Sequence, residues 1–128
     1  MTLHGFRIGD PTGKELGLRI GAVRYLPRGV RKSEYARRGL FDVWLPAVAP
    51  SRALIAWLKS REWTPKVARM FFTRYEREMR ASTDSRQTIK LLAAIAKRAP
   101  IAIGCYCEDE RRCHRSALVR LIRQAARL

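Results

Sequence analysis

The sequence has few acidic residues, few cysteines and no long hydrophobic run, and each shortage excludes a class of protein. The longest weakly polar stretches, residues 41–50 and 99–107, are too short to span a bilayer, so we expect no membrane-spanning segment and no membrane partner. The N-terminus lacks the apolar region of a secretory signal, and we therefore expect a cytoplasmic protein. The three cysteines are an odd number confined to positions 105–113, which argues against a disulfide framework.

The scarcity of acidic residues leaves a large positive charge. Only 11 acidic side chains oppose 27 cationic ones, and the formal net charge is +16. Such a charge attracts phosphate groups at low salt, so polyanions are plausible partners. However, 21 of the 27 cationic residues are arginines, a bias that a GC-rich genome produces on any surface. The charge alone therefore assigns no function.

The length and composition are typical of one small globular domain, with 128 residues, 47% of them hydrophobic and 30% charged. Residues 1–16 contain a cluster of turn formers around Gly9, Pro11 and Gly13, and we expect a flexible arm or hairpin there. Residues 17–128 are expected to form a single α/β domain. Turn formers at Pro27 and Gly29 end an apolar run that starts at Leu18, which predicts a strand followed by a loop.

Apolar spacing and capping residues predict the remaining elements. Ser51, Thr64 and Asp84 are good N-caps, and each precedes a stretch with helical periodicity. We expect a buried strand over residues 101–106 and helices over 52–59, from 65 onward, from 84 to about 99 and from about 113 to 127. The order strand, helices, strand and helix predicts two parallel strands of a central sheet with flanking helices. Ligands of such sheets lie beyond the carboxyl ends of the strands, which brings residues 24–29 and 105–115 to one rim.

The C-terminal strand, loop and helix carry the chemistry-bearing residues. Cys113 is expected at the N-terminus of the last helix, where unpaired N–H groups and the helix dipole favour a thiolate and lower its pKa from about 8.5 toward neutrality. Cys113 and His114 are therefore the candidate catalytic residues, and Cys105, Cys107, Glu108 and Ser116 the candidate supporting residues. The alternative is that Cys113 is a small buried residue at the start of a helix.

The same loop also has two other interpretations. Cys105, Cys107, Cys113 and His114 offer three sulfurs and one nitrogen to zinc, although the Cys-x-Cys spacing is unusual for a structural zinc site. We therefore expect no cofactor, with zinc as the alternative. Cys105 and Arg111 match the length of a cysteine-phosphatase loop, but three acidic residues stand where such a loop needs glycines.

Arg24, Arg28 and Arg115 are the candidate anion-binding residues, because the predicted sheet brings them to the same rim. This arrangement favours an enzyme, or an enzyme-like binder, that holds an anionic small molecule or nucleotide. Two alternatives use the charge differently. One is an adaptor that docks an acidic protein, and the other is a nucleic-acid-binding module in which Tyr35 stacks on a base among Arg28, Arg31, Lys32, Arg37 and Arg38.

The order of several motifs resembles a known family, the domain of unknown function 488, which includes the YeaO-like proteins. The resemblance covers residues from about 18 to the C-terminus. Its marks are Arg24 with Pro27, Arg28 and Gly29; Asp42, Trp44, Leu45, Ala49, Pro50 and Ser51; Trp63, Phe71, Phe72 and Tyr75; and Cys105-Tyr106-Cys107-Glu108 followed by Cys113-His114-Arg115-Ser116. It implies a compact α/β domain with thiol chemistry or anion binding at the Cys-His-Arg end. Val23 stands where the family is expected to have an aspartate.

Overall fold

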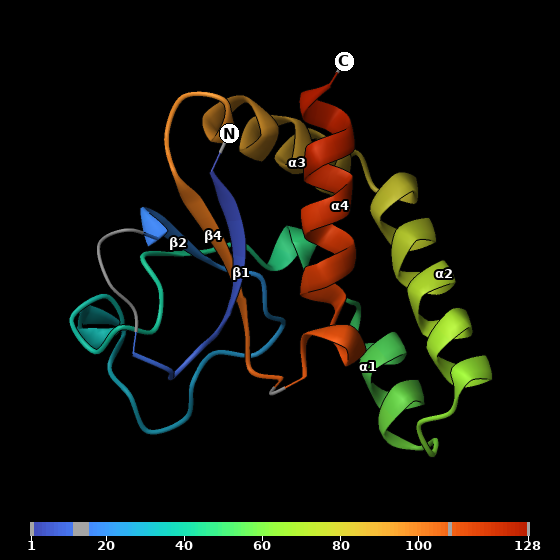
Figure 1. The fold of residues 1–128 in the computed structure, drawn as a ribbon. Helices are drawn as coiled ribbons and strands as arrows, with labels where there is room; N and C mark the ends of the chain where they lie inside the picture. Colours follow the sequence, from blue (N-terminus) through green and yellow to red (C-terminus); the bar gives the residue numbers. More distant parts are fainter. Residues whose placement is uncertain (1, 12–15, 108, 128) are drawn as a thin grey trace.

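A four-stranded parallel sheet forms the centre of the fold, with the strand order β1-β4-β2-β3 (Figure 1). The computed structural model describes residues 2–11, 16–107 and 109–127. Its strands are β1 (Leu3–Arg7), β2 (Leu18–Gly21), β3 (Val43–Trp44) and β4 (Ile101–Cys105). The predicted α/β class, with a parallel central sheet and a C-terminal strand-loop-helix, is therefore confirmed.

Strand β1 corrects the expectation for the N-terminus. Residues 3–7, which were assigned to an arm or hairpin, pair in parallel with β4 along its whole length, from Leu3 opposite Ile101 to Arg7 opposite Cys105. Leu3 and Phe6 are buried. The sequence does not predict this strand, because its five residues show no sustained alternation of apolar and polar side chains and lie next to a cluster of turn formers. Pairing with the buried β4 determines their conformation instead. Residues 12–15 of the expected arm lie outside the described residues.

The four α-helices of the described residues begin close to where the capping residues predict. They are α1 (Arg52–Lys59), α2 (Pro65–Ala81), α3 (Thr83–Ala96) and α4 (His114–Ala126). The Ser51 and Thr64 hydroxyls accept hydrogen bonds from Leu54 N and Val67 N, both at 3.1 Å, which confirms both predicted caps. The predicted cap at Asp84 is wrong, because the cap of α3 lies two residues earlier, at Ser82, whose Oγ accepts from Ser85 N at 3.2 Å.

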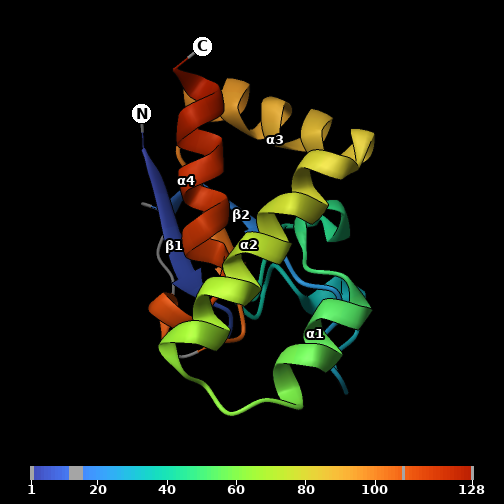
Figure 2. The same cartoon turned by 90° about the vertical axis from the view of Figure 1, so that its right-hand side faces the viewer.

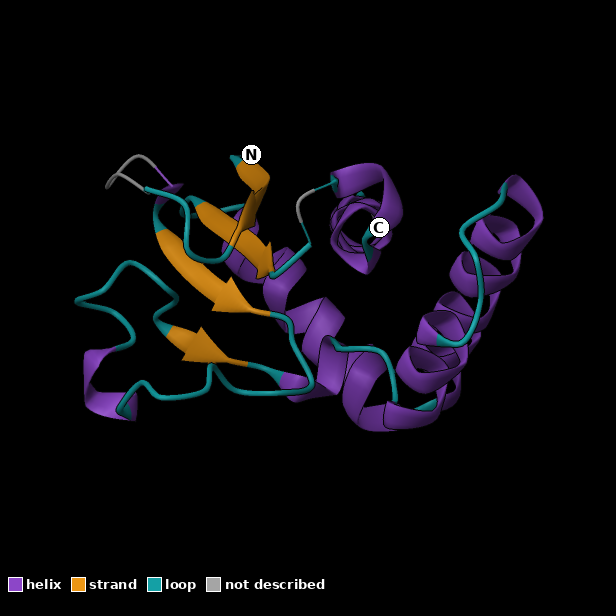
Figure 3. Ribbon diagram, turned by 90° about the horizontal axis from the view of Figure 1, so that it is seen from below, coloured by secondary structure: helices purple, strands orange, loops and turns teal. Residues whose placement is uncertain are grey.

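The helices lie on one side of the sheet, and the loop that carries residues 24–41 lies on the other (Figures 1 and 3). Helix α4 packs directly on β1 and β4, and α2 covers its outer face (Figure 2). Two buried clusters result. The larger one joins the sheet to the helices through residues such as Ile103, Leu118 and Tyr75, and the smaller one joins the sheet to the loop through Phe6 and Phe41.

No helix among the described residues is both long and apolar enough to cross a membrane.

The carboxyl end of β4 leads directly into the candidate site. Residues Ile101–Cys105 are all buried, because the strand is flanked by β1 and β2 and covered on both faces. The chain then leaves the sheet, forms a 3-10 turn at Glu110–Arg112 and enters α4 at His114. This path brings the end of the strand and the start of the helix together at one rim of the sheet, as the sequence order predicts.

Candidate functional site

Three cysteines and one histidine meet where β4 ends and α4 begins. The sulfur of Cys105 lies 3.8 Å from that of Cys107 and 3.9 Å from His114 Nδ1. The sulfur of Cys113 lies 3.8 Å from the same nitrogen. Cys105, Cys113 and His114 are buried, whereas Cys107 is exposed. Below, these four residues are called the Cys/His cluster.

The orientation of His114 is fixed by a backbone group. Its Nε2 lies 2.5 Å from the carbonyl oxygen of Ala22, just beyond the end of β2. A carbonyl oxygen can only accept, so Nε2 carries the proton and donates it. The other ring nitrogen, Nδ1, is therefore unprotonated in the neutral ring, and its lone pair faces the sulfurs of Cys105 and Cys113. Burial lowers the pKa of His114, which keeps the ring neutral.

The surroundings of the thiols differ from the sequence expectation. Cys113 does cap α4, and its sulfur accepts from Arg115 N at 3.5 Å. Hydrogen bonding with the other two thiols, together with burial, nevertheless raises the pKa of Cys113. The expectation of a lowered pKa at this thiol is wrong, because loss of solvent and two neighbouring sulfurs outweigh the helix N-terminus. Hydrogen bonding with Cys107 and burial also raise the pKa of Cys105, to about 11, whereas the pKa of Cys107 is lowered.

A cavity of about 280 Å³ opens above the Cys/His cluster. We call the buried lining side chains of Cys105, Cys113 and His114 its floor, and the exposed lining residues, such as Lys59 and Arg112, its mouth. The walls between them are largely apolar. The complete lining is Val23, Arg24, Tyr25, Pro50, Ile55, Leu58, Lys59, Phe71, Cys105, Tyr106, Cys107, Arg112, Cys113 and His114.

The predicted anion-binding arginines occupy three different environments. Arg24 lines the cavity, and its guanidinium donates to the carbonyl oxygens of Pro46, Ala49 and Pro50 at 3.0–3.2 Å. Arg28 is exposed and is not part of the cavity lining. The structure thus brings Arg24, but not Arg28, to the same cavity as Cys113.

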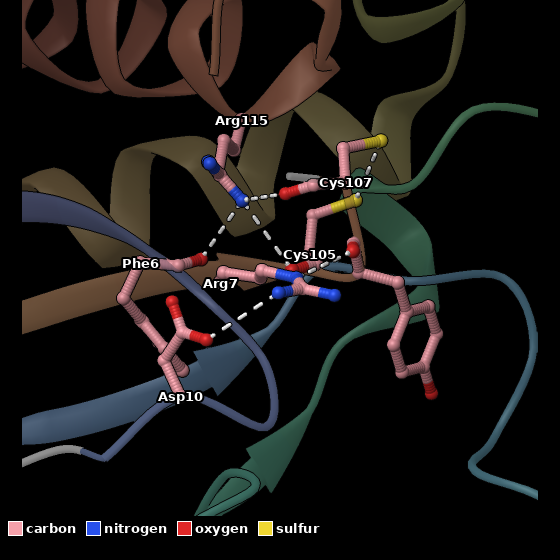
Figure 4. Close-up of polar contacts among 7 residues, drawn as sticks. Phe6, Arg7, Asp10, Cys105, Cys107 and Arg115 are labelled. Carbon is pink, nitrogen blue, oxygen red and sulfur yellow. Dashed lines mark hydrogen bonds and ion pairs between the residues drawn. The ribbon is translucent and has the colours of Figure 1, made fainter. Parts of the chain in front are cut away.

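Arg115 lies beneath the loop and not in the cavity. It is only 4% exposed, and its NH1 donates to the carbonyl oxygens of Phe6, Cys105 and Cys107 at 3.2, 3.4 and 2.8 Å (Figure 4). Its Nε is buried and has no hydrogen-bond partner among the described residues. Arg115 therefore ties the ends of β1 and β4 to α4 through carbonyl oxygens.

Of the supporting residues, Ser116 donates its hydroxyl to Cys113 O at 2.9 Å and belongs to the first turn of α4. Glu108 lies outside the described residues. The sequence analysis did not select Lys59 or Arg112 as site residues. Arg112 is next to Cys113 in sequence and could have been chosen on that ground, whereas Lys59 reaches the cavity only because α1 packs beside it.

The nucleic-acid interpretation required Tyr35 to be exposed, and in the structure it is buried. Tyr35 is only 8% exposed, and its ring packs against Phe41 at a centroid distance of 5.0 Å. It is therefore a core residue of the loop side of the sheet and cannot stack on a base. Arg37, from the same basic segment, pairs with Glu34 at 2.8 Å.

Comparisons with known proteins place the chain in a family. No curated protein and no solved structure matches it. One family model, DUF488-N3a, matches residues 3–126 and is described as the active DUF488-N3 subclade. The match covers almost the whole chain, including β1, the cavity lining and the Cys/His cluster. It agrees with the resemblance on which the sequence analysis relied, and the chain belongs to the DUF488-N3a family.

Proposed function

We propose that this protein is a small enzyme, or an enzyme-like binder, that holds an anionic small molecule or nucleotide in the cavity above the Cys/His cluster. The observation that carries the proposal is the composition of the cavity from floor to mouth. Thiols and an imidazole lie at its buried end, apolar side chains line its walls, and cationic side chains stand at its opening. A concave, largely apolar site with a few convergent polar groups is typical of small-molecule binding.

The charges at the mouth support an anionic ligand. Lys59 and Arg112 are exposed and line the opening, and acidic residues are absent from the described lining. The guanidinium of Arg112 also lies over the ring of Trp63 at 5.5 Å and pairs with Asp109 at 3.7 Å, and neither of these residues lines the cavity. A carboxylate or phosphate at the mouth would gain charge-assisted hydrogen bonds from these side chains.

The walls support a ligand that also has an apolar part. Ile55, Leu58 and Phe71 line the cavity, and Tyr25 and Tyr106 flank its exposed side. A volume of about 280 Å³ accommodates a small ring or acyl group and not a long chain. We therefore expect a ligand with a compact apolar body and one anionic group.

The reacting groups in this proposal are Cys113 and His114. The sulfur of Cys113 and Nδ1 of His114 are 3.8 Å apart at the floor, so a thiol and a basic nitrogen face the same end of the cavity. Because the pKa of Cys113 is raised, its thiol keeps its proton in the resting protein, and Nδ1 is placed to accept that proton. The wording of the family model, an active subclade, is consistent with a reaction at this floor.

Calorimetric titration with phenyl phosphate, inorganic phosphate and AMP tests the proposal. We expect phenyl phosphate to bind more tightly than inorganic phosphate, because its ring removes apolar wall surface from water. Arg112→Gln should weaken phenyl phosphate binding about tenfold, or about 1.4 kcal/mol. The matched control is Arg98→Gln, which removes the same charge from an exposed position near the opposite end of β4.

Two outcomes would contradict the proposal. One is the absence of binding by all three compounds to the folded protein at low salt. The other is equal affinity of the Arg112→Gln and Arg98→Gln variants for phenyl phosphate, which would mean that net charge alone attracts the anion. Thermal unfolding of both variants checks that neither substitution disturbs the fold.

A further inference from the structure

The Cys/His cluster has the donor set and the spacing of a metal site. Among the described residues, one donor atom from each of Cys105, Cys113 and His114 lies within 4.8 Å of the other two, and all three residues are buried. The Cys107 sulfur lies 3.8 Å from that of Cys105, on the side of the cavity. Three sulfurs and one nitrogen thus gather at the buried end of the cavity.

The distances match those between ligands of a tetrahedral ion. With zinc–sulfur and zinc–nitrogen bonds of about 2.3 and 2.0–2.1 Å, tetrahedral geometry places two sulfurs about 3.8 Å apart and a sulfur and a nitrogen about 3.5 Å apart. The observed Cys105–Cys107 sulfur separation is 3.8 Å. The two observed separations from His114 Nδ1 are 3.8 and 3.9 Å. The atoms of Cys105, Cys113 and His114 therefore lie close to the separations that one ion requires, whereas the Cys107 side chain, which is not within 4.8 Å of all three, would have to turn toward the ion.

His114 is already oriented as a ligand. Metal-binding histidines commonly donate their other ring N–H to a carbonyl or carboxylate oxygen, which fixes the ring and directs the free lone pair at the metal. Here Nε2 donates to Ala22 O at 2.5 Å, and Nδ1 faces the sulfurs. The Arg115 N–H donates to the Cys113 sulfur at 3.5 Å, a contact that a metal-bound thiolate would keep.

The cluster also accounts for a buried charge that has no acidic partner among the described residues. The Arg115 guanidinium is 4% exposed, and it donates hydrogen bonds to three carbonyl oxygens. Burying an unpaired cation is costly. Three thiolates around a divalent ion carry one net negative charge, and this charge would lie next to the guanidinium, whose NH1 contacts the carbonyls of Cys105 and Cys107.

We propose that Cys105, Cys113 and His114 bind one zinc ion and that Cys107 supplies the fourth ligand from the cavity side. Sulfur and imidazole ligands select a soft or borderline ion over magnesium or calcium, and tetrahedral geometry favours zinc. The proposal goes beyond the function proposed above and replaces one part of it: with the ion bound, Cys113 and His114 are ligands and no longer a free thiol and base, while anion binding at the mouth is unchanged. The fourth position faces the cavity, so Cys107 is the ligand that can be lost while the ion stays bound.

Metal binding is measured on reduced protein that has been stripped with a chelator. Equilibrium dialysis against Zn²⁺ should leave one ion per chain. Co²⁺ in the same site should show the thiolate-to-cobalt charge-transfer absorption and the intense visible bands of a tetrahedral ion. Cys107→Ser should still bind one ion, with affinity reduced about tenfold or more and with weaker charge-transfer absorption.

A histidine pair supplies the matched control. His114→Gln should lose stoichiometric zinc binding, whereas His4→Gln, at an exposed position of β1, should keep it. In case a buried substitution unfolds the chain, a second measurement uses the unaltered protein. Zinc should protect all three cysteines from alkylation by iodoacetamide, and peptide mass spectrometry reports each residue separately.

The proposal is overturned if the folded, unaltered protein takes up neither Zn²⁺ nor Co²⁺ stoichiometrically. It is also overturned if the cobalt form lacks charge-transfer absorption, or if zinc leaves the alkylation of Cys105 and Cys113 unchanged. The phenyl phosphate titration is performed on chelator-treated protein. If phenyl phosphate does not bind, the proposed ligand is wrong and the proposed metal site is unaffected. If no metal binds, the proposed metal site is wrong and the proposed ligand is unaffected.

Discussion

Arg115→Met is expected to lower the free energy of unfolding by about 3 kcal/mol, because three carbonyl oxygens around a buried charge lose their donor. The NH1 group of Arg115 is the atom that donates to Phe6, Cys105 and Cys107. Figure 4 shows these carbonyls converging on the guanidinium from the end of β1 and from the end of β4 with the following loop. Methionine has a similar length but no donor, so the ends of both strands would be released from α4. Urea denaturation followed by circular dichroism measures the change.

Arg115→Lys is the informative companion variant. The three hydrogen bonds to these carbonyls come from one nitrogen, NH1, and an ammonium group has three donors that can be directed at three oxygens. Lysine also removes the buried Nε that has no partner among the described residues. We expect Arg115→Lys to cost no more than about 1.5 kcal/mol, within the range of one lost hydrogen bond. Equal stability of Arg115→Met and the unaltered protein would refute a structural role for this arginine.

Gly17→Ala is expected to destabilise the fold by about 3 kcal/mol or more, through a steric clash added to backbone strain. Gly17 has a φ of 71°, and an added Cβ would lie 2.1 Å from Pro100 O and 2.7 Å from Pro100 C. The same carbonyl accepts from Leu18 N at 3.1 Å, where β2 begins to pair with β4. Backbone atoms cannot move aside here without opening the start of this pairing.

Gly29→Ala measures the cost of backbone strain without a steric clash. Gly29 has nearly the same φ, 72°, but a Cβ there would meet no atom within 4 Å. Its substitution should therefore cost only the strain of a left-handed residue, about 1–2 kcal/mol. Both variants are compared by urea denaturation at the same pH. Similar losses of unfolding free energy for Gly17→Ala and Gly29→Ala would show that the close approach to Pro100 does not add to the destabilisation.

The parts of the fold that could be predicted are those that local chemistry determines. Ser51 and Thr64 precede helices as caps, and the buried run at 101–105 reads as a strand, because these signals depend on a few neighbouring residues. Strand β1 depends instead on pairing with β4, almost 100 residues away. No local period reveals that pairing.

The site residues divide in the same way. The sequence shows that Cys113 and His114 begin a helix, so their meeting with Cys105 follows from the strand order. The sequence does not show which carbonyl oxygens at the strand ends need a hydrogen-bond donor. For that reason it predicts that Arg115 binds an anion, whereas in the structure Arg115 donates to these carbonyls. Tyr35 was misread similarly, because its packing against Phe41 joins separate parts of a loop.

The central claim is that cationic residues at the mouth of the cavity direct anions to the Cys/His cluster. Alkylation of Cys107 by iodoacetate and by iodoacetamide tests it most directly, because Cys107 is the exposed cysteine of the cavity. Both rates are proportional to the fraction of Cys107 that is thiolate. Their ratio is therefore independent of that fraction and reports the effect of the reagent's charge. Chelator-treated protein is used, so that no metal protects the sulfur.

At an assumed separation of roughly 8 Å in water, two cations together attract a charged reagent by about 1 kcal/mol, which corresponds to about fivefold in rate. We therefore expect the iodoacetate-to-iodoacetamide rate ratio at Cys107 to exceed that of glutathione about fivefold at low salt. Lys59→Gln and Arg112→Gln together should remove most of this excess, while Arg98→Gln should retain it. A ratio equal to that of glutathione, or one that all three substitutions lower equally, would contradict the claim.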